Sequence, residues 1–150
     1  MAYSIIQTSD GGYVLAGYTG SFGAGGLDVW LVKVDSSGQM QWNETYGGSN
    51  NDTAYSLVQT RDGGFALAGY TQSFGAGGSD FWLIKTNSAG RVEWNQSFGG
   101  TGEDVAYSLT QTEDNGFALV GSSNSSGTPG KNDFWLVKTD EAGKMEWNQT

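Results

Sequence analysis

Hydrophobic residues occur along the chain in short runs separated by glycine-rich and polar turns, and no segment keeps the 3.6-residue period of an amphipathic helix. The run AYSIIQT at 2–8 leads into the turn sequence SDGG, and the run YVLAGYT follows at 13–19. Two such runs joined through Asp-Gly predict a β-hairpin, because glycine adopts the positive φ that a tight turn needs. Small residues in the second run, Ala16 and Gly17, favour close approach of neighbouring backbones.

Two further runs complete the pattern. The sequence DVWLVKV at 28–34 is almost continuously apolar and contains β-branched and aromatic residues, which is typical of a strand covered on both faces. After the turn DSSG, the sequence QMQWNETY at 39–46 alternates polar and apolar residues and predicts a half-exposed strand. The first third of the chain therefore predicts four strands.

This four-strand pattern occurs three times. The segment 2–19 aligns with 54–71 and 106–123 at a constant offset of 52, and the first two units are identical at 30 of 52 positions. The third unit carries one extra residue where SFGAGG becomes SSGTPGK, and its turn is EDNG, with Asn115 in place of glycine. We place the units at 2–53, 54–105 and 106–150.

Four antiparallel strands in a unit of ~50 residues, with covered middle strands and a half-exposed last strand, describe a blade of a β-propeller. A solenoid is the alternative, but its repeats are usually shorter and lack a four-strand meander. The sequence therefore predicts an all-β fold with three four-stranded antiparallel blades.

The order of a first strand, an Asp-Gly turn, an LAG strand and a Trp-bearing strand resembles the WD40 and kelch class of propeller repeats. More closely, DGGYVLAGYT and DVWLVKVDSSGQMQWNETYGG resemble the glycine- and tryptophan-rich repeats of large archaeal and bacterial cell-surface proteins. The resemblance covers all three units, but the His and the Trp-Asp dipeptide of WD40 repeats are missing, so no WD40 partner is implied. It implies a non-enzymatic interaction or adhesion module, and an extracellular or cell-surface location for the parent protein.

Three blades do not close a ring, because propellers typically have four to eight. An open array would expose the apolar faces of the first and last blades. Those faces should be complementary, so we expect two chains to close head to tail as a six-bladed homodimer. Nine blades from three chains is the next multiple, and a fragment of a longer propeller is the rival interpretation.

Composition narrows the partners and the chemistry. Sixteen Asp and Glu residues against seven Lys and Arg give a net charge of −9, which argues against nucleic acid and against an anionic membrane surface. The absence of Cys and His removes thiolate sites and the commonest general base. No apolar run is long enough to span a membrane, and Met1 leads into a strand-like run without a signal-peptide pattern. We expect no cofactor and no catalytic residue.

Aspartates precede the Trp-bearing strand in every unit: Asp28, Asp80 and Asp133. The stretch GAGGLDVWL differs at one position from a calcium-binding nonapeptide, but that motif needs tandem copies, and these lie 52 residues apart. We therefore expect these aspartates to accept hydrogen bonds from loop amides, with weak calcium binding as the alternative.

Aromatic residues recur in three further sets. Trp30, Trp82 and Trp135 lie in the apolar third strand and are expected in the core. The outer-strand set, Trp42, Trp94 and Trp147, is expected to pack between blades, with sugar stacking as the alternative. Tyr3, Tyr55 and Tyr107 begin the innermost strands near one mouth of the channel, where they would cap the core or bind a glycan or a peptide. A carbohydrate-binding propeller is thus the first alternative function, and a hydrolase with channel carboxylates is the second.

Overall fold

The computed structural model describes residues 1–128 and 130–150 and forms three separate four-stranded antiparallel sheets. The strands of the first sheet are β1 (Ala2–Gln7), β2 (Tyr13–Thr19), β3 (Asp28–Val34) and β4 (Met40–Tyr46). Those of the second are β5 (Asp52–Gln59), β6 (Phe65–Thr71), β7 (Asp80–Thr86) and β8 (Val92–Phe98), and those of the third are β9 (Asp104–Gln111), β10 (Phe117–Ser123), β11 (Asp133–Thr139) and β12 (Met145–Gln149). The predicted all-β class with four antiparallel strands per repeat is confirmed.

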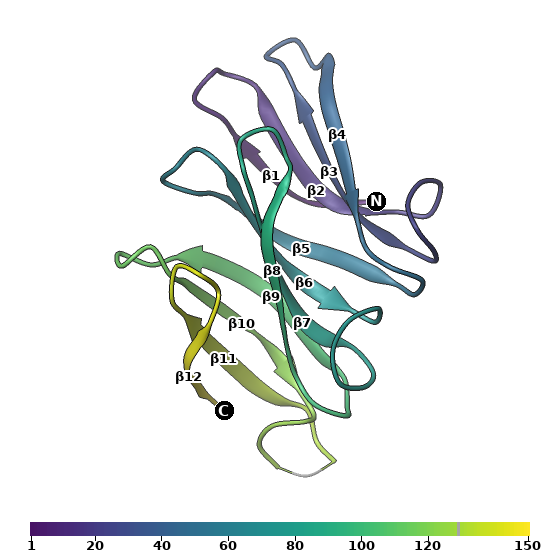
Figure 1. Ribbon diagram of the computed structural model, residues 1–150, viewed down its shortest axis with the longest axis vertical. Helices are drawn as coiled ribbons and strands as arrows, with labels where there is room; N and C mark the ends of the chain where they lie inside the picture. Colours follow the sequence, from purple (N-terminus) through teal and green to yellow (C-terminus); the bar gives the residue numbers. More distant parts are fainter. Residues whose placement is uncertain (129) are drawn as a thin grey trace.

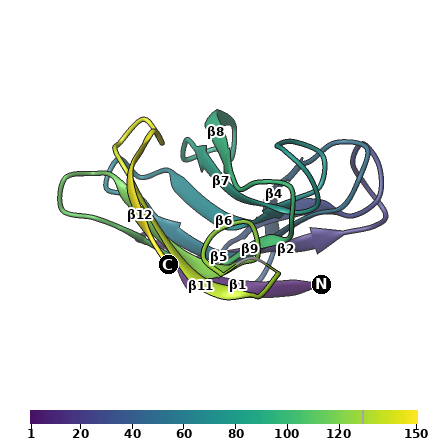
Figure 2. The ribbon, with the colours of Figure 1, turned by 90° about the horizontal axis from the view of Figure 1, so that it is seen from below.

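The three sheets follow one another down the molecule in the order of the sequence (Figure 1). Strands β1, β5 and β9 are first in their sheets and are close neighbours, whereas β4, β8 and β12 are last. Seen from below, β1 lies at the lower edge of the molecule and β8 at the upper edge (Figure 2). We call β1, β5 and β9 the inner strands. No helix in the described ranges is long and apolar enough to cross a membrane.

The hairpin turns after the inner strands have the predicted backbone. Gly11 and Gly63 adopt φ values of 80° and 83°, and Asn115 takes the equivalent place in the third sheet at φ 66°. Asn115 is the one non-glycine residue with positive φ in the described part of the chain. The short polar side chain of asparagine tolerates this conformation, which explains how the third turn keeps its shape without glycine.

Glycines in the second strands allow the inner strands to bulge. In the second sheet the register of β5 against β6 shifts between Ala54 and Ser56, so Tyr55 is an extra residue in its strand. A Cβ on Gly69 would collide with the carbonyl oxygen of Thr53 and would lie 2.8 Å from the Cα of Ala54. The bulge therefore depends on the missing side chain, and the other two sheets repeat the register shift.

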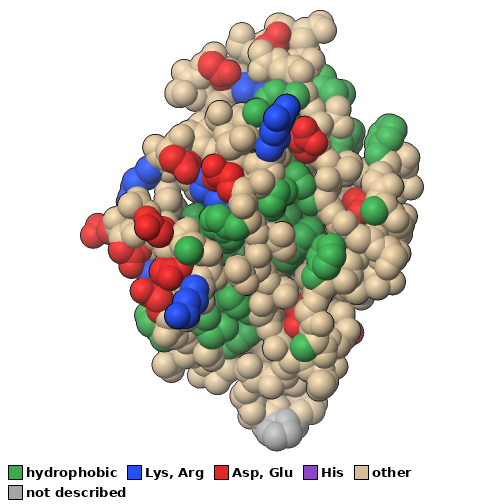
Figure 3. Space-filling model, viewed as in Figure 1, with side chains coloured by type: hydrophobic (Ala, Val, Ile, Leu, Met, Phe, Trp, Pro, Cys, Tyr) green, Lys and Arg blue, Asp and Glu red, His purple; other side chains and the backbone are tan. Residues whose placement is uncertain are grey.

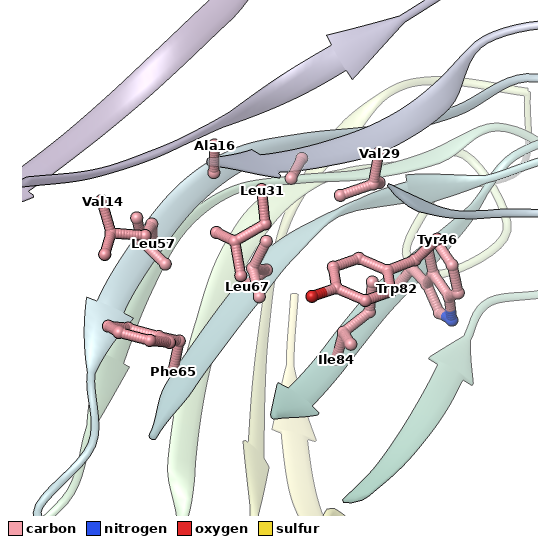
Figure 4. Packing of buried hydrophobic residues seen from close by; sticks show 11 residues of the cluster. Val14, Ala16, Val29, Leu31, Tyr46, Leu57, Phe65, Leu67, Trp82 and Ile84 are labelled. Atoms are coloured by element: carbon pink, nitrogen blue, oxygen red, sulfur yellow. The ribbon is translucent and has the colours of Figure 1, made fainter. Parts of the chain in front are cut away.

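The core lies between the sheets and forms two clusters. One face of the first sheet, with Val14, Val29 and Leu31, packs against Leu67 and Ile84 of the second. Figure 4 shows these side chains pointing toward one another. The opposite face of the second sheet packs in the same way against the third. Strand β7 is buried along its whole length, as expected for a strand covered on both faces, while β8 exposes most of its residues.

Candidate functional site

Five tyrosines from two sheets and one inner strand of the third form a continuous aromatic row. The ring of Tyr55 lies 4.8 Å from that of Tyr3 and 5.6 Å from that of Tyr107, measured between centroids. Tyr18 lies 5.9 Å from Tyr3, and Tyr70 lies 6.1 Å from Tyr55. We call these residues the tyrosine row. The sequence pointed to the three inner-strand members, and the structure brings them together.

The row is accessible and has unused hydrogen-bonding capacity. Tyr3 and Tyr107 are about half exposed, at 45% and 55%, and Tyr55 is partly exposed. Among the described residues, no group hydrogen-bonds the hydroxyls of Tyr55, Tyr70 or Tyr107. Tyr46 differs, because it is buried and its hydroxyl donates to the carbonyl oxygen of Gly90. The buried Tyr46 hydroxyl is thus satisfied, whereas those of Tyr55, Tyr70 and Tyr107 in the row are not.

Burial and the neighbouring phenols lower the acidity of two members of the row, Tyr55 and Tyr3. Partial burial, followed by the neighbouring Tyr70 and Tyr3, raises the pKa of Tyr55 to about 12. Burial and the neighbouring Tyr18 also raise the pKa of Tyr3 above its ordinary value. The phenols of Tyr3 and Tyr55 are therefore neutral hydrogen-bond donors at physiological pH.

The surface around the row carries no exposed charge on the inner strands. Within the described ranges, their only ionisable carboxyl or amino side chains are Asp52 and Asp104, and both are fully buried. Asp52 accepts hydrogen bonds from the Gly48 amide at 2.9 Å and the Ser73 hydroxyl at 2.7 Å, and from the Thr71 hydroxyl. The inner strands thus present tyrosine, serine, threonine and glutamine, together with Ile5 of β1, which is 60% exposed. They offer no exposed carboxylate pair of the kind that a channel hydrolase would need.

The aspartates at the starts of the third strands cap the glycine-rich loops. The Oδ2 atoms of Asp28, Asp80 and Asp133 accept from the amides of Ala24, Ala76 and Thr128 at 3.1, 3.0 and 2.6 Å. The Oδ1 atom of Asp28 is the one buried side-chain atom without a conventional hydrogen bond in the described part of the chain. A Cβ on Gly47 would collide with it, so the absence of a side chain at Gly47 leaves room for this oxygen.

Among the described residues, no group of three or more His, Cys, Asp or Glu side chains is placed to hold a metal ion. Burial and the nearby Asp104 and Glu103 raise the pKa of Asp80, while its bond from Ala76 opposes that rise. These aspartates are thus arranged as loop caps.

The third-strand tryptophans differ in burial according to their sheet. Trp82 and Trp135 are 4% exposed, and Trp30 is half-buried. In each sheet the indole donates to an asparagine of the last strand at 3.1 Å: Trp30 to Asn43, Trp82 to Asn95 and Trp135 to Asn148. The difference in burial arises because the first sheet has no neighbour on the Trp30 side.

The outer tryptophans pack on the next sheet where one exists. Trp42 lies 6.1 Å from Phe65, and Trp94 lies 5.7 Å from Phe117, between ring centroids. Trp147 is 46% exposed because no sheet follows it. The first two are therefore packing residues, and the third has no aromatic partner in the described chain.

Both ends of the stack present apolar faces. On the first sheet, Leu15, Trp30 and Val32 line a cavity of about 290 Å³. On the third sheet, Phe134 is 55% exposed, whereas the equivalent Phe81 of the second sheet is fully buried. We call these surfaces the first end face and the last end face.

A buried lysine in each sheet is a feature that the hydrophobic pattern did not reveal. Lys33, Lys85 and Lys138 lie inside the apolar third strands and pair with Asp10, Asp62 and Asp114 at 2.9, 2.8 and 2.8 Å. Lys85 also pairs with Glu93 at 2.7 Å. Figure 3 shows charged side chains gathered along the left edge of the molecule. The recurrence of the three lysines at the repeat spacing was the sequence feature that could have revealed them.

No protein-family model matches the chain. Over 132 aligned residues the chain is 29% identical to Regulatory protein FlaEY of Caulobacter vibrioides. The match covers 79% of this chain and 13% of that protein, so most of the three repeats aligns with a small part of a much longer chain.

Proposed function

We propose that the chain is a set of three β-propeller blades that closes into a ring with a second copy and serves as a non-enzymatic interaction scaffold. The observation that carries this proposal is the equivalence between the two end faces and the faces buried between sheets. An end face of this kind would be costly to leave in water, since each buried apolar side chain contributes about 1.5–3 kcal/mol.

The last end face matches the face that the second sheet already uses. Ala118, Val120, Phe134 and Leu136 occupy the places of Ala66, Ala68, Phe81 and Leu83, all of which are fully buried. Phe81 packs on Trp135 of the next sheet at 4.7 Å between ring centroids. By analogy with this contact between Phe81 and Trp135, Phe134 would pack on Trp30 of the second copy. The partly exposed Leu15 and Val32 beside Trp30 would be covered as Leu67 and Ile84 are.

The outer edge offers a second matching contact. Trp42 lies against Gly90, and Trp94 against Gly143, in the last turn of the following sheet. The equivalent Gly38 has no atom within 4 Å of a Cβ position. Trp147 would lie over Gly38 and Tyr13 of the second copy, and Tyr13 is itself 37% exposed.

Two copies bring six blades, which falls inside the usual range of propellers, and three copies would bring nine. Because the two end faces differ, the contact is head to tail, and closure needs two such contacts in a dimer. Similarity to part of a protein named as a regulator is compatible with a binding role, as is the absence of an exposed carboxylate on the described inner strands. We place the parent protein at the cell surface on the resemblance of its repeats.

Light scattering across a dilution series tests closure. We expect a mass of two 15.9 kDa chains for the unmodified protein and of one chain for Phe134→Asp. Phe74→Asp is the matched control, because Phe74 is 45% exposed in the corresponding loop of the second sheet, which carries neither end face. A single-chain mass for the unmodified protein would contradict the proposal.

A mixing experiment tests the head-to-tail arrangement. Phe134→Asp damages the last end face and Trp30→Asp damages the first, so each variant alone should be monomeric. An equimolar mixture retains one intact pair of faces and should form a weaker, open dimer. A contact between two like faces would instead leave one of the single variants dimeric.

A further inference from the structure

We propose that the tyrosine row is a binding site for a neutral glycan. The row lies within one chain, so this proposal extends the interaction role above without depending on ring closure. Its three inner-strand members, Tyr3, Tyr55 and Tyr107, are at least partly exposed and follow one another at centroid distances of 4.8 and 5.6 Å. This spacing is comparable with the length of a sugar ring along a glycan chain.

The position of Tyr55 in its strand favours a ligand over packing. The register shift beside Tyr55 removes it from regular pairing with β6, and Gly69 makes the close backbone approach possible. Residues in bulges are commonly re-aimed toward a functional surface. The tilt between its ring and those of Tyr3 and Tyr107, at 58° and 42°, gives the row an uneven surface in place of one flat stack.

The polar groups beside the rings suit hydroxyl-bearing ligands. The hydroxyls of Tyr55, Tyr70 and Tyr107 have no hydrogen-bond partner in the described ranges, and each can donate and accept. Exposed Ser108 and Gln59 lie further along the same strands and add groups that do both. Aromatic faces beside such groups match the alternating C–H faces and hydroxyl edges of a sugar.

Charge selects a neutral ligand. Anionic ligands are favoured by cationic side chains, but the inner strands carry no Lys or Arg, and the whole chain has a net charge of −9. The Met1 ammonium lies at one end of the row, where it donates to the carbonyl oxygen of Tyr18 at 2.7 Å. The only carboxylates on these strands are buried and satisfied by loop donors, so they offer no exposed partner for a cation. A neutral glycan uses what remains: rings, hydroxyls and amides.

Isothermal titration calorimetry with maltohexaose and cellohexaose tests the proposal, with an uronic-acid hexamer as the charged comparison. We expect one neutral sugar to bind and the uronate to bind more weakly or not at all. Tyr55→Ala and Tyr107→Ala should each weaken binding roughly tenfold, the loss expected when about 1.4 kcal/mol of stacking is removed. Tyr55→Phe, which retains the ring, should weaken it less, and Phe22→Ala should leave it unchanged.

Three results overturn the proposal. They are no binding of either neutral sugar at millimolar concentration, binding that both alanine variants leave intact, and stronger binding of the uronate. A decaproline peptide provides a further test, because aromatic-lined grooves also recognise extended proline-rich segments. Binding of that peptide with no binding of sugars would assign the row to peptides. Light scattering of the same samples shows whether the dimer has formed, so a loss of glycan binding can be distinguished from a loss of association.

Discussion

At the scale of single residues, the buried lysines carry the main charge interactions of the sheets. Lys85 Nζ donates to Asp62, Glu93 and the Thr86 carbonyl oxygen, and its side chain is only 7% exposed. The two carboxylates are about half exposed, so solvent screens each pair. The lysine nevertheless joins the inner hairpin turn to the last strand of its sheet.

Replacing Lys85 by methionine should lower the free energy of unfolding by about 2 kcal/mol, the usual size of hydrogen bonds to a charged group. The carbonyl oxygen of Thr86 would then lose its donor inside the sheet. Urea unfolding measures the change, with Lys144→Met as the control because Lys144 is exposed in a hairpin. Equal stability of the two variants would show that the buried lysine has no special role.

Lowering the pH should weaken the ion pair between Lys85 and Asp62. Burial alone would raise the pKa of Asp62, but hydrogen bonds from Lys85, Thr60 and the Gly64 amide outweigh it and lower the pKa to about 2. The ionised carboxylate therefore stabilises the fold fully above its ordinary pKa of 3.8, and this contribution disappears as the pH falls toward 2. The pKa values of Asp10 and Asp114 are lowered as well, chiefly by bonds from Thr8 and from Lys138.

Urea unfolding at a series of pH values tests this. We expect stability to fall between about pH 4 and pH 2. Asp62→Asn should be less stable at pH 7 and should show a shallower fall, since one of the three carboxylates no longer titrates. An unchanged slope in the variant would contradict the assignment.

At the scale of strands and turns, the bulges and hairpins respond differently to the loss of a glycine. Gly69 has no room for a Cβ beside the Thr53 backbone, whereas Gly63 has open space but a φ of 83°. Gly69→Ala should therefore cost several times more stability than Gly63→Ala, for which we expect about 1 kcal/mol. Thermal unfolding of both variants provides the comparison. Gly63→Asn should be nearly neutral, because Asn115 occupies the equivalent position.

The strands and their turns were predictable because their causes are local. Asp-Gly at 10–11 and Asp-Asn at 114–115 specify the hairpins by backbone preference, and continuous apolar sequence specifies the covered strand β7. The tyrosine row was predictable only in part. Its inner-strand members recur at the repeat spacing. Tyr18 and Tyr70 lie on β2 and β6, and they reach the row only because a bulge shifts the register of β1 against β2 and of β5 against β6. Lys85 was missed because one lysine in an apolar run changes the pattern little.

At the scale of the whole molecule, the end faces should link stability to protein concentration. If a second copy covers Phe134 and Trp30, association stabilises the folded chain by mass action. The unfolding temperature should therefore rise with concentration for the unmodified protein and should stay constant for Phe134→Asp. Differential scanning fluorimetry over a hundredfold range of concentration gives the measurement. A constant temperature for the unmodified protein would exclude a folding-linked assembly.

Each sheet is built from one continuous segment of the chain, and this affects the order in which the sheets unfold. Every strand pairs only within its own sheet of four consecutive strands, so a sheet can open or form without unthreading another. The first and third sheets each lack a neighbour on one side within the described chain, whereas the second is covered on both. In a single chain, such as the Phe134→Asp variant, amide protons of β6 and β7 should accordingly exchange with deuterium more slowly than those of β2, β3, β10 and β11. That chain would then melt from its two ends toward a central sheet that survives longest.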